Sequence, residues 1–183
     1  MAEREAPGDI GLVQAFVNTV DLEDGPEQLA DPAALKGWLA ARHLLDPSQQ
    51  VGEADLKHAI AVREAMRGAI GANSGQAMYP VDVATLNEAA SASGLRMRFA
   101  PDGQARLEPE AAGVAAALGR IVAALYSAMK DEGWSRLKLC GDPSCRWAFY
   151  DLSRNHSSRW CDMSSCGNRQ KARRFRTRVK AGA

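Results

Sequence analysis

The four cysteines of this chain lie close together toward its C-terminal end, and their spacing suits a metal ion. They form two short pairs in the arrangement C-x4-C-x15-C-x4-C: Cys140, Cys145, Cys161 and Cys166. Two close pairs joined by a longer connection can present four thiolates tetrahedrally to one Zn2+ ion. Because cysteine fills all four positions, no position stays open for a catalytic water. The pattern therefore predicts a structural zinc ion.

Two disulfides, an iron–sulfur cluster or unrelated buried thiols are the alternatives to zinc for these four cysteines. The opening MAEREAPGDI is charged and has no apolar segment of the secretory kind, so we expect a cytoplasmic protein, in which structural disulfides are rare. No apolar run approaches the roughly 20 residues of a membrane span, so we expect no membrane partner. His156 lies between the two pairs, and we expect an exposed turn histidine there rather than a ligand.

A run of cations follows the last cysteine, in a segment with the composition of a helix. The candidate nucleic-acid-binding residues are Asn168, Arg169, Lys171, Arg173, Arg174, Arg176, Arg178 and Lys180. Arginine outnumbers lysine five to two, and its planar fork suits contacts with phosphate or guanine. Ala172, Phe175 and Val179 fall on one narrow apolar stripe, which we expect to pack on the zinc module. The pattern predicts a helix that binds double-stranded DNA.

The charge of the chain is unevenly distributed, which also favours a polyanionic partner. From Trp134 onward there are 12 lysines and arginines and 3 aspartates, a net charge of +9, and the residues before it carry −8, although the whole chain carries only +1. A solvated charged helix is the alternative. RNA is another candidate partner, because aromatic residues can stack on unpaired bases. In a module this small, we expect these aromatic residues to form its core instead: Trp147, Phe149, Tyr150 and Trp160.

The rest of the chain is predicted to be mostly helical. Apolar residues at helical spacing indicate helices over 10–22, from Pro32 (capped by Asp31) to about Leu44, over 53–70, from Asp82 to Ala90 and over 110–132, stopped by Gly133. In residues 95–109, apolar and polar residues alternate on both sides of the turn sequence PDG. This pattern predicts a hairpin with Leu95, Met97 and Phe99 on one face.

The cysteine segment predicts a small module of its own. The segment GDPS suits a tight knuckle, and RWAFYDL has the composition of a strand. We expect SSRWC to pair with that strand across the turn SRNH. A knuckle, a hairpin and ligands at a helix start make a treble-clef-like zinc module. The predicted fold class is therefore α+β: a mainly helical domain with a small antiparallel sheet over 9–133, then the zinc module with its basic helix over 134–183.

A third hypothesis gives the helical domain a small-molecule ligand and leaves the zinc tail to mediate protein contacts. Arg63 and Arg67 lie one helical turn apart and could hold an anion between them, with Asn18 and Thr19 as further polar candidates. The alternative is that these four residues are structural. The histidines have no acid or nucleophile at motif spacing, so we do not expect an enzyme. A homodimer, which would double the small footprint of one finger, is a further hypothesis.

Residues 140–178, with CGNR at Cys166–Arg169, resemble the CGNR zinc finger family. AFVNTVDL and LADPAALKGWLAARHLL resemble the opening of the ABATE domain, and VREAMRGAI resembles its arginine-bearing helix. The resemblance implies a stress-induced transcriptional regulator, in which the four cysteines bind zinc, the finger binds DNA through a helix that begins with Asn168 and Arg169, and the N-terminal domain senses or regulates. One departure is visible: Gln14 and Ala15 precede Phe16, where the family usually has Leu-Asp.

Overall fold

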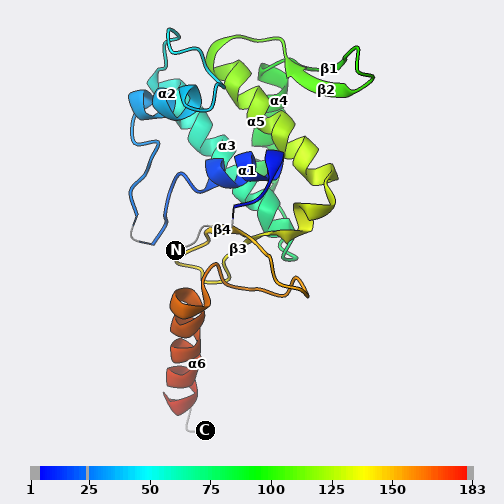
Figure 1. The fold of residues 1–183 in the computed structure, drawn as a ribbon. Coiled ribbons are helices and arrows are strands. Elements are labelled where there is room, and N and C mark those ends of the chain that lie inside the picture. The colour runs from blue at the N-terminus through cyan, green and yellow to red at the C-terminus, as the bar shows by residue number, and fades with distance from the viewer. Residues whose placement is uncertain (1–4, 24, 181–183) are drawn as a thin grey trace.

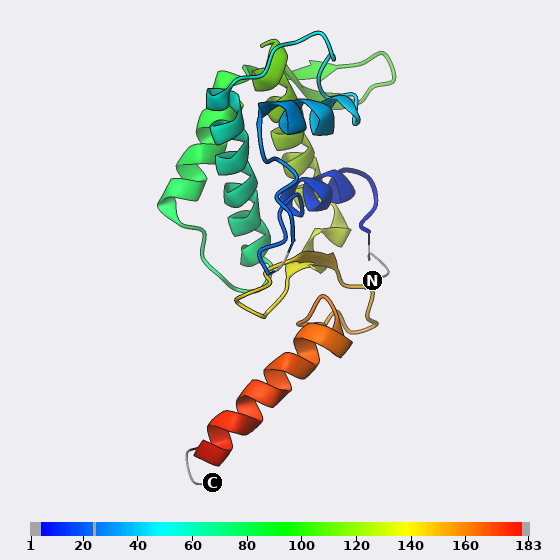
Figure 2. The ribbon, with the colours of Figure 1, turned by 90° about the vertical axis from the view of Figure 1, so that its left-hand side faces the viewer.

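Apolar residues at helical spacing build a body of five helices. The computed structural model of the protein describes residues 5–23 and 25–180, apart from the side chain of Lys180. The helices of the body are α1 (Gly8–Val17), α2 (Pro32–Ala40), α3 (Glu53–Ala72), α4 (Pro80–Ala92) and α5 (Gly113–Lys130). The long helices α3 and α5 run side by side, with α1 across their lower halves (Figures 1 and 2).

The core of the body lies where α1, α3 and α5 meet. Val13 and Phe16 of α1, Met66 of α3 and Ile121 of α5 are completely buried there. Burying one side chain of this size stabilises the fold by about 1.5–3 kcal/mol. α5 has the length and composition of a membrane-crossing helix, but 56% of it is buried inside the protein, as expected for the core helix of a folded domain.

The predicted helices are present, but several of their ends differ. α2 ends at Ala40 rather than near Leu44, and α5 begins at Gly113 rather than at residue 110. Asp31 caps α2 as expected and accepts a hydrogen bond from Ala34 N. α4 begins at Pro80 rather than at Asp82, because proline suits the first helical position. α1 ends at Val17, and Val20 pairs with Glu27 in a short bridge. α5 ends at Lys130, and a 3-10 helix, η1 (Glu132–Arg136), follows where Gly133 was expected as the stop.

The predicted hairpin is confirmed as strands β1 (Leu95–Phe99) and β2 (Ala105–Pro109). The strands pair antiparallel, with Met97 opposite Leu107, and Gly103 takes a positive φ in the turn. The hairpin contacts α5 along β2. Met97 and Phe99 nevertheless remain largely exposed.

The second sheet differs from the predicted one. Strand β4 (Ala148–Tyr150) pairs with β3 (Leu137–Leu139) across the cysteine knuckle, not with the segment SSRWC. β4 can pair there because Leu137 and Leu139 continue the apolar core of the body, which also receives Ala148. The core of the body therefore extends past residue 134 into the zinc module.

The basic helix α6 (Asn168–Lys180) follows a single π-helical turn, η2 (Met163–Gly167). α6 projects from the module, away from the body (Figures 1 and 2). The expectation that its apolar stripe packs on the zinc module is wrong: Ala172, Phe175 and Val179 are all exposed. The fold class itself is confirmed, as a mostly helical domain with a small sheet followed by a zinc module with a terminal basic helix.

Gly119 of α5 allows a close approach that gives a test of this packing. A Cβ atom at Gly119 would lie 2.4 Å from Cβ and 2.6 Å from Oγ of the buried Ser93. We expect Gly119→Ala to lower the free energy of unfolding by about 1–3 kcal/mol. In contrast, a Cβ at Gly37 of α2 meets nothing within 4 Å, so Gly37→Ala should stabilise by up to about 1 kcal/mol. Urea unfolding of both variants tests this; equal effects would contradict the packing described.

Candidate metal centre and basic helix

The first cysteine pair is held by a tight turn between β3 and β4. Cys140 N donates to Trp147 O at 2.8 Å, and Cys145 N donates to Asp142 O at 3.0 Å. The buried carboxylate of Asp142 accepts hydrogen bonds from the Ser144 backbone N at 3.2 Å and hydroxyl at 2.8 Å. Burial opposes ionisation of Asp142, but the hydrogen bonds from Ser144 outweigh it and hold its pKa below the usual range. The turn thus has the knuckle geometry that GDPS predicted.

The second pair comes from the loop before α6 and from η2. Asp162 caps η2 by accepting a hydrogen bond from Ser164 N at 2.6 Å, which fixes the turn that carries Cys166. Arg159 O accepts a hydrogen bond from Gly141 N at 2.8 Å and joins this loop to the first knuckle. Two segments about twenty residues apart in the sequence are therefore brought together by backbone hydrogen bonds.

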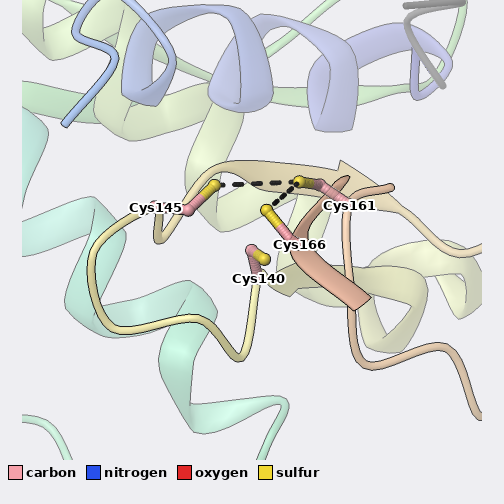
Figure 3. Close-up of side chains that lie close together, drawn as sticks. All are labelled: Cys140, Cys145, Cys161 and Cys166. Atoms are coloured by element: carbon pink, nitrogen blue, oxygen red, sulfur yellow. Dashed lines mark hydrogen bonds between the residues drawn. The ribbon is translucent and has the colours of Figure 1, made fainter. Parts of the chain in front are cut away.

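The four cysteine sulfurs converge on one point (Figure 3). All four Sγ atoms lie within 4.8 Å of one another, and Cys161 Sγ lies 3.7 Å from both Cys145 Sγ and Cys166 Sγ. A tetrahedral zinc ion with Zn–S bonds of about 2.3 Å separates its sulfurs by about 3.8 Å, whereas a disulfide needs about 2.05 Å. The donor set and its spacing therefore fit zinc.

The thiols of this cluster do not ionise equally. Hydrogen bonds from Cys145 and Cys161 lower the pKa of Cys140 to about 2. The same contact with Cys140 raises the pKa of Cys145 to about 12, and burial raises the pKa of Cys166. Zinc binds cysteines as thiolates, so binding of the ion by this cluster is coupled to proton release.

Aromatic side chains form the small core around the thiols. Trp147 and Trp160 are partly buried against the cysteine cluster, and Phe149 and Tyr150 are buried. The two tryptophans therefore belong to the core of the module, as expected, whereas Tyr150 belongs to the core of the body.

The loop between β4 and the second pair is ordered by Asp151. Its carboxylate is completely buried and accepts hydrogen bonds from Lys138 Nζ at 2.8 Å, Ser153 N at 2.9 Å and Ser158 N at 3.0 Å. Burial opposes ionisation of Asp151, but these hydrogen bonds, that of Lys138 foremost, hold its pKa well below the usual range. His156 is exposed in this loop, as expected, with a positive φ.

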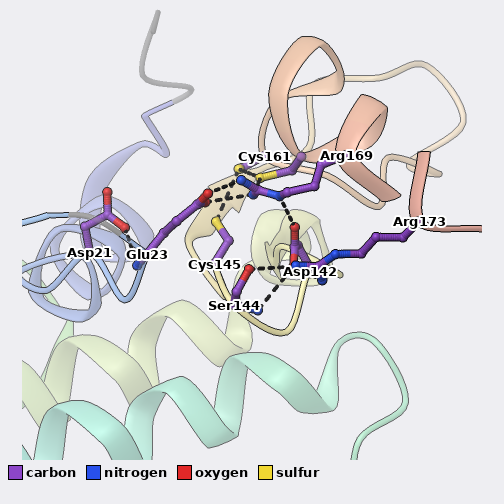
Figure 4. Close-up of polar contacts among 9 residues, drawn as sticks. Asp21, Glu23, Asp142, Ser144, Cys145, Cys161, Arg169 and Arg173 are labelled. Carbon is purple, nitrogen blue, oxygen red and sulfur yellow. Dashed lines mark hydrogen bonds and ion pairs between the residues drawn. The ribbon is translucent and has the colours of Figure 1, made fainter. Parts of the chain in front are cut away.

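Arg169 was expected to face nucleic acid, but its side chain is bound to acidic residues of the knuckle and the body (Figure 4). Its guanidinium donates from Nε to Asp142 Oδ2 at 2.7 Å, from Nη2 to Glu23 Oε2 at 2.7 Å, from Nη1 to Glu23 Oε1, and from Nη2 to Cys166 Sγ at 3.1 Å. A donor beside a metal-binding sulfur stabilises its negative charge. Arg169 therefore joins α6, the knuckle, the cysteine cluster and the loop after α1, and its side chain faces the body.

The other predicted cations lie along α6. Arg173 Nη1 is 3.6 Å from Asp142 Oδ1. Four more are exposed and, within residues 5–23 and 25–180, pair with no carboxylate: Lys171, Arg174, Arg176 and Arg178. Asn168 is also exposed, and its Nδ2 donates to Ser164 O at 3.0 Å. The side chain of Lys180 lies outside the described residues.

Three of the predicted ligand residues of the body, Thr19, Arg63 and Arg67, belong to an internal network instead of an open site. Glu64 supplies the anion expected between the two arginines: its carboxylate accepts from Arg63 Nε and from Arg67 Nε, each at 2.9 Å. Arg63 Nη1 also donates to Thr19 Oγ1 at 3.1 Å and to Glu27 Oε1 at 2.7 Å. Arg63 and Arg67 are only 4% and 1% exposed, so neither guanidinium is presented to solvent.

Part of this network reaches the zinc module. Arg67 Nη2 donates to Val17 O at 2.7 Å and its Nη1 donates to Arg146 O at 3.1 Å, in the knuckle. Asn18 exchanges two hydrogen bonds with the backbone of Ala148, at 2.8 and 2.9 Å, and so pairs with β4 as a strand would. Arg67 and Asn18 therefore hold the module against the body.

Sequence reasoning missed the acidic partners in these contacts. Glu23 and Asp142 stand far from Arg169 in the sequence, and no local pattern connects them. Glu64 was visible, because its spacing of three residues from Arg67 is that of a helical ion pair.

Four converging thiols followed by a basic helix define the class of the protein, a zinc-finger protein. Residues 136–179 match the family described as "CGNR zinc finger", and residues 11–131 match ABATE, described as "Putative stress-induced transcription regulator". The ABATE match covers more than half of the chain, so the protein belongs to this family, and the resemblance found in the sequence is confirmed. Cys140, Cys145, Cys161 and Cys166 are the binding site of one structural zinc ion. No curated protein matches the chain significantly.

The Glu64 network predicts a specific pH dependence. Burial opposes ionisation of Glu64, but hydrogen bonds from Arg67 and Arg63 hold its pKa below the usual range. Its contribution to stability is therefore complete above the unfolded pKa of about 4.3 and is lost as the pH falls through the folded pKa. We expect Glu64→Gln to lower the free energy of unfolding by roughly 1–2 kcal/mol at pH 7, because the carboxylate is partly exposed.

The difference from wild type should stay constant from pH 7 to about 5 and shrink as the pH is lowered from there to about 3, in a series of urea titrations. Glu110→Gln is the matched control: among the described residues, Glu110 pairs only with exposed arginines of the hairpin, so its replacement should change stability little. A Glu64→Gln effect that stays constant over the whole range would contradict the ionised bridge.

Proposed function

We propose that this regulator binds double-stranded DNA through α6, in the cytoplasm, and that its activity is binding rather than catalysis. One observation carries the proposal: a helix without a single acidic residue stands clear of the body, with exposed cations along its length (Figure 2). Cations on such a helix bind phosphates and release condensed counterions, which supplies sequence-independent affinity. At about 1.5 Å per residue, α6 is about 20 Å long, enough to follow a groove for several base pairs.

The zinc ion supports this activity structurally. Cys166 lies in the turn that begins α6, and Arg169 ties the first turn of the helix to the knuckle. A module this small has little core, so zinc contributes folding free energy on the order of 10 kcal/mol. In this proposal the metal sets the position of α6 and does not contact DNA.

The N-terminal domain is the regulating part in this proposal. A cavity of about 530 Å³ lies between α1 and the zinc module, lined by Gln14, Asn18 and Arg42 of the body and by Trp147. This volume suits a small-molecule effector. An effector there would contact Asn18, which holds β4, and so could alter how the module sits on the body. Two copies would double the contact with DNA.

RNA is the second candidate partner, and the two tryptophans beside the cysteines argue against it, although Phe175 of α6 is exposed. Recognition of unpaired bases needs exposed aromatic faces. Trp147 and Trp160 instead pack on the cysteine cluster. Duplex DNA is therefore the better-supported partner.

Removal of two cations from α6 tests the proposal. We expect Arg174→Ala combined with Arg178→Ala to weaken binding to duplex DNA. The negative slope of log K against log salt concentration should become shallower by roughly 1.8, at about 0.9 for each phosphate that is no longer neutralised. Fluorescence anisotropy of a labelled duplex across a salt series measures both effects.

The matched control removes the same charge elsewhere. Arg96 and Arg98 are exposed on the hairpin, at the end of the molecule opposite α6 (Figure 1), so their double replacement by alanine should leave the slope unchanged. Equal losses in both double variants would show that net charge alone drives binding and would sink the proposed role of α6.

A further inference from the structure

The apolar stripe of α6 has no partner within the described residues. Phe175 is 68% exposed and Val179 is 58% exposed, and Ala172 is exposed between them and the module. Water contact with apolar side chains of this size is unfavourable by roughly 25 cal/mol per Å². A helix that only binds phosphates through its cations needs no exposed apolar side chains.

The stripe has cations on both sides. Positions 168, 172, 175 and 179 share one face of a helix, at about 100° per residue. Asn168 is the polar N-terminal end of this face. Lys171, Arg174 and Arg178 border the face on one side, and Arg176 and Arg173 border it on the other.

This arrangement matches the major groove of DNA. The groove is about 12 Å wide and admits one α-helix, its two walls are phosphate backbones, and thymine methyl groups lie on its floor. Cations on both flanks of α6 would meet both walls while the stripe meets the floor. An amide such as Asn168 is the side chain that pairs with adenine, and apolar side chains contact the thymine methyl.

We propose that the apolar stripe, Ala172, Phe175 and Val179, reads A·T base pairs in the major groove together with Asn168 at its N-terminal end. The inference rests on the proposed function, because it requires α6 to bind duplex DNA. The exposed hydrogen bond from the Asn168 amide to Ser164 O is one that a base edge can replace.

Other surfaces suit the stripe less well. Two copies of α6 would bring together helices that carry cations and no acid, and like charges repel. A membrane-surface helix needs a broad apolar face. The apolar stripe of α6 is narrow and has only two large side chains, Phe175 and Val179. The charge of both flanks and the width of the stripe therefore favour the groove.

Thymine methyl groups can be removed from DNA without changing its charge, which gives a direct test. A duplex of A·T base pairs is compared with the same duplex carrying uracil in place of thymine, using the zinc-loaded full chain. We expect wild type to bind the thymine duplex about fourfold more tightly per methyl group contacted. Phe175→Ala should lose most of this preference yet keep its salt slope.

Thr177→Ala is the matched control, because Thr177 lies on the opposite face of α6 and should keep the preference. Zinc content confirms that each variant is folded. Salt-dependent binding with equal affinity for thymine and uracil duplexes overturns this inference and leaves the proposed function standing. No binding to either duplex overturns both. Binding to phosphatidylserine vesicles that Phe175→Ala abolishes, with no thymine preference, assigns the stripe to membranes and overturns the inference.

Discussion

The meeting of four sulfur atoms at one point is the constraint on which the functional half of this structure depends. The sulfurs come from a knuckle between two strands and from a turn before a helix, and all lie within 4.8 Å. Four thiolates this close repel each other, so all four cysteines ionise together only when a cation lies among them. The same turn that carries Cys166 begins α6, so the metal also fixes where the basic helix starts.

Buried polar contacts then join this centre to the helical body. Asn18 pairs with the backbone of β4, Arg67 reaches the knuckle carbonyl of Arg146, and Arg169 reaches Glu23. Charged groups are costly to bury unless they are paired, and here each of the two arginines has its partner. The module and the body share one apolar core as well. The module is therefore joined directly to the body, through buried polar contacts and a shared apolar core.

Local chemistry explains what the sequence could and could not predict. The helices, the hairpin around PDG and the cysteine cluster follow from spacing and turn residues, which act over short distances. The partner of β4 could not be predicted, because Leu137 and Leu139 pair there only once the core of the body is present. Arg169 looked like a DNA-binding residue because its partners, Glu23 and Asp142, lie far away in the sequence. The arginines of α3 looked like a ligand site although one partner, Glu64, is a local neighbour, because their other partners come from distant parts of the chain.

The measurement that tests this account most directly is the affinity of the full chain for duplex DNA with and without zinc, at fixed salt concentration. The account predicts that removal of zinc by a chelator weakens binding at least about tenfold, because α6 loses its fixed start, and that added zinc restores it. Equal affinity of the zinc-loaded and zinc-free protein would contradict the claim that the metal centre positions the DNA-binding helix.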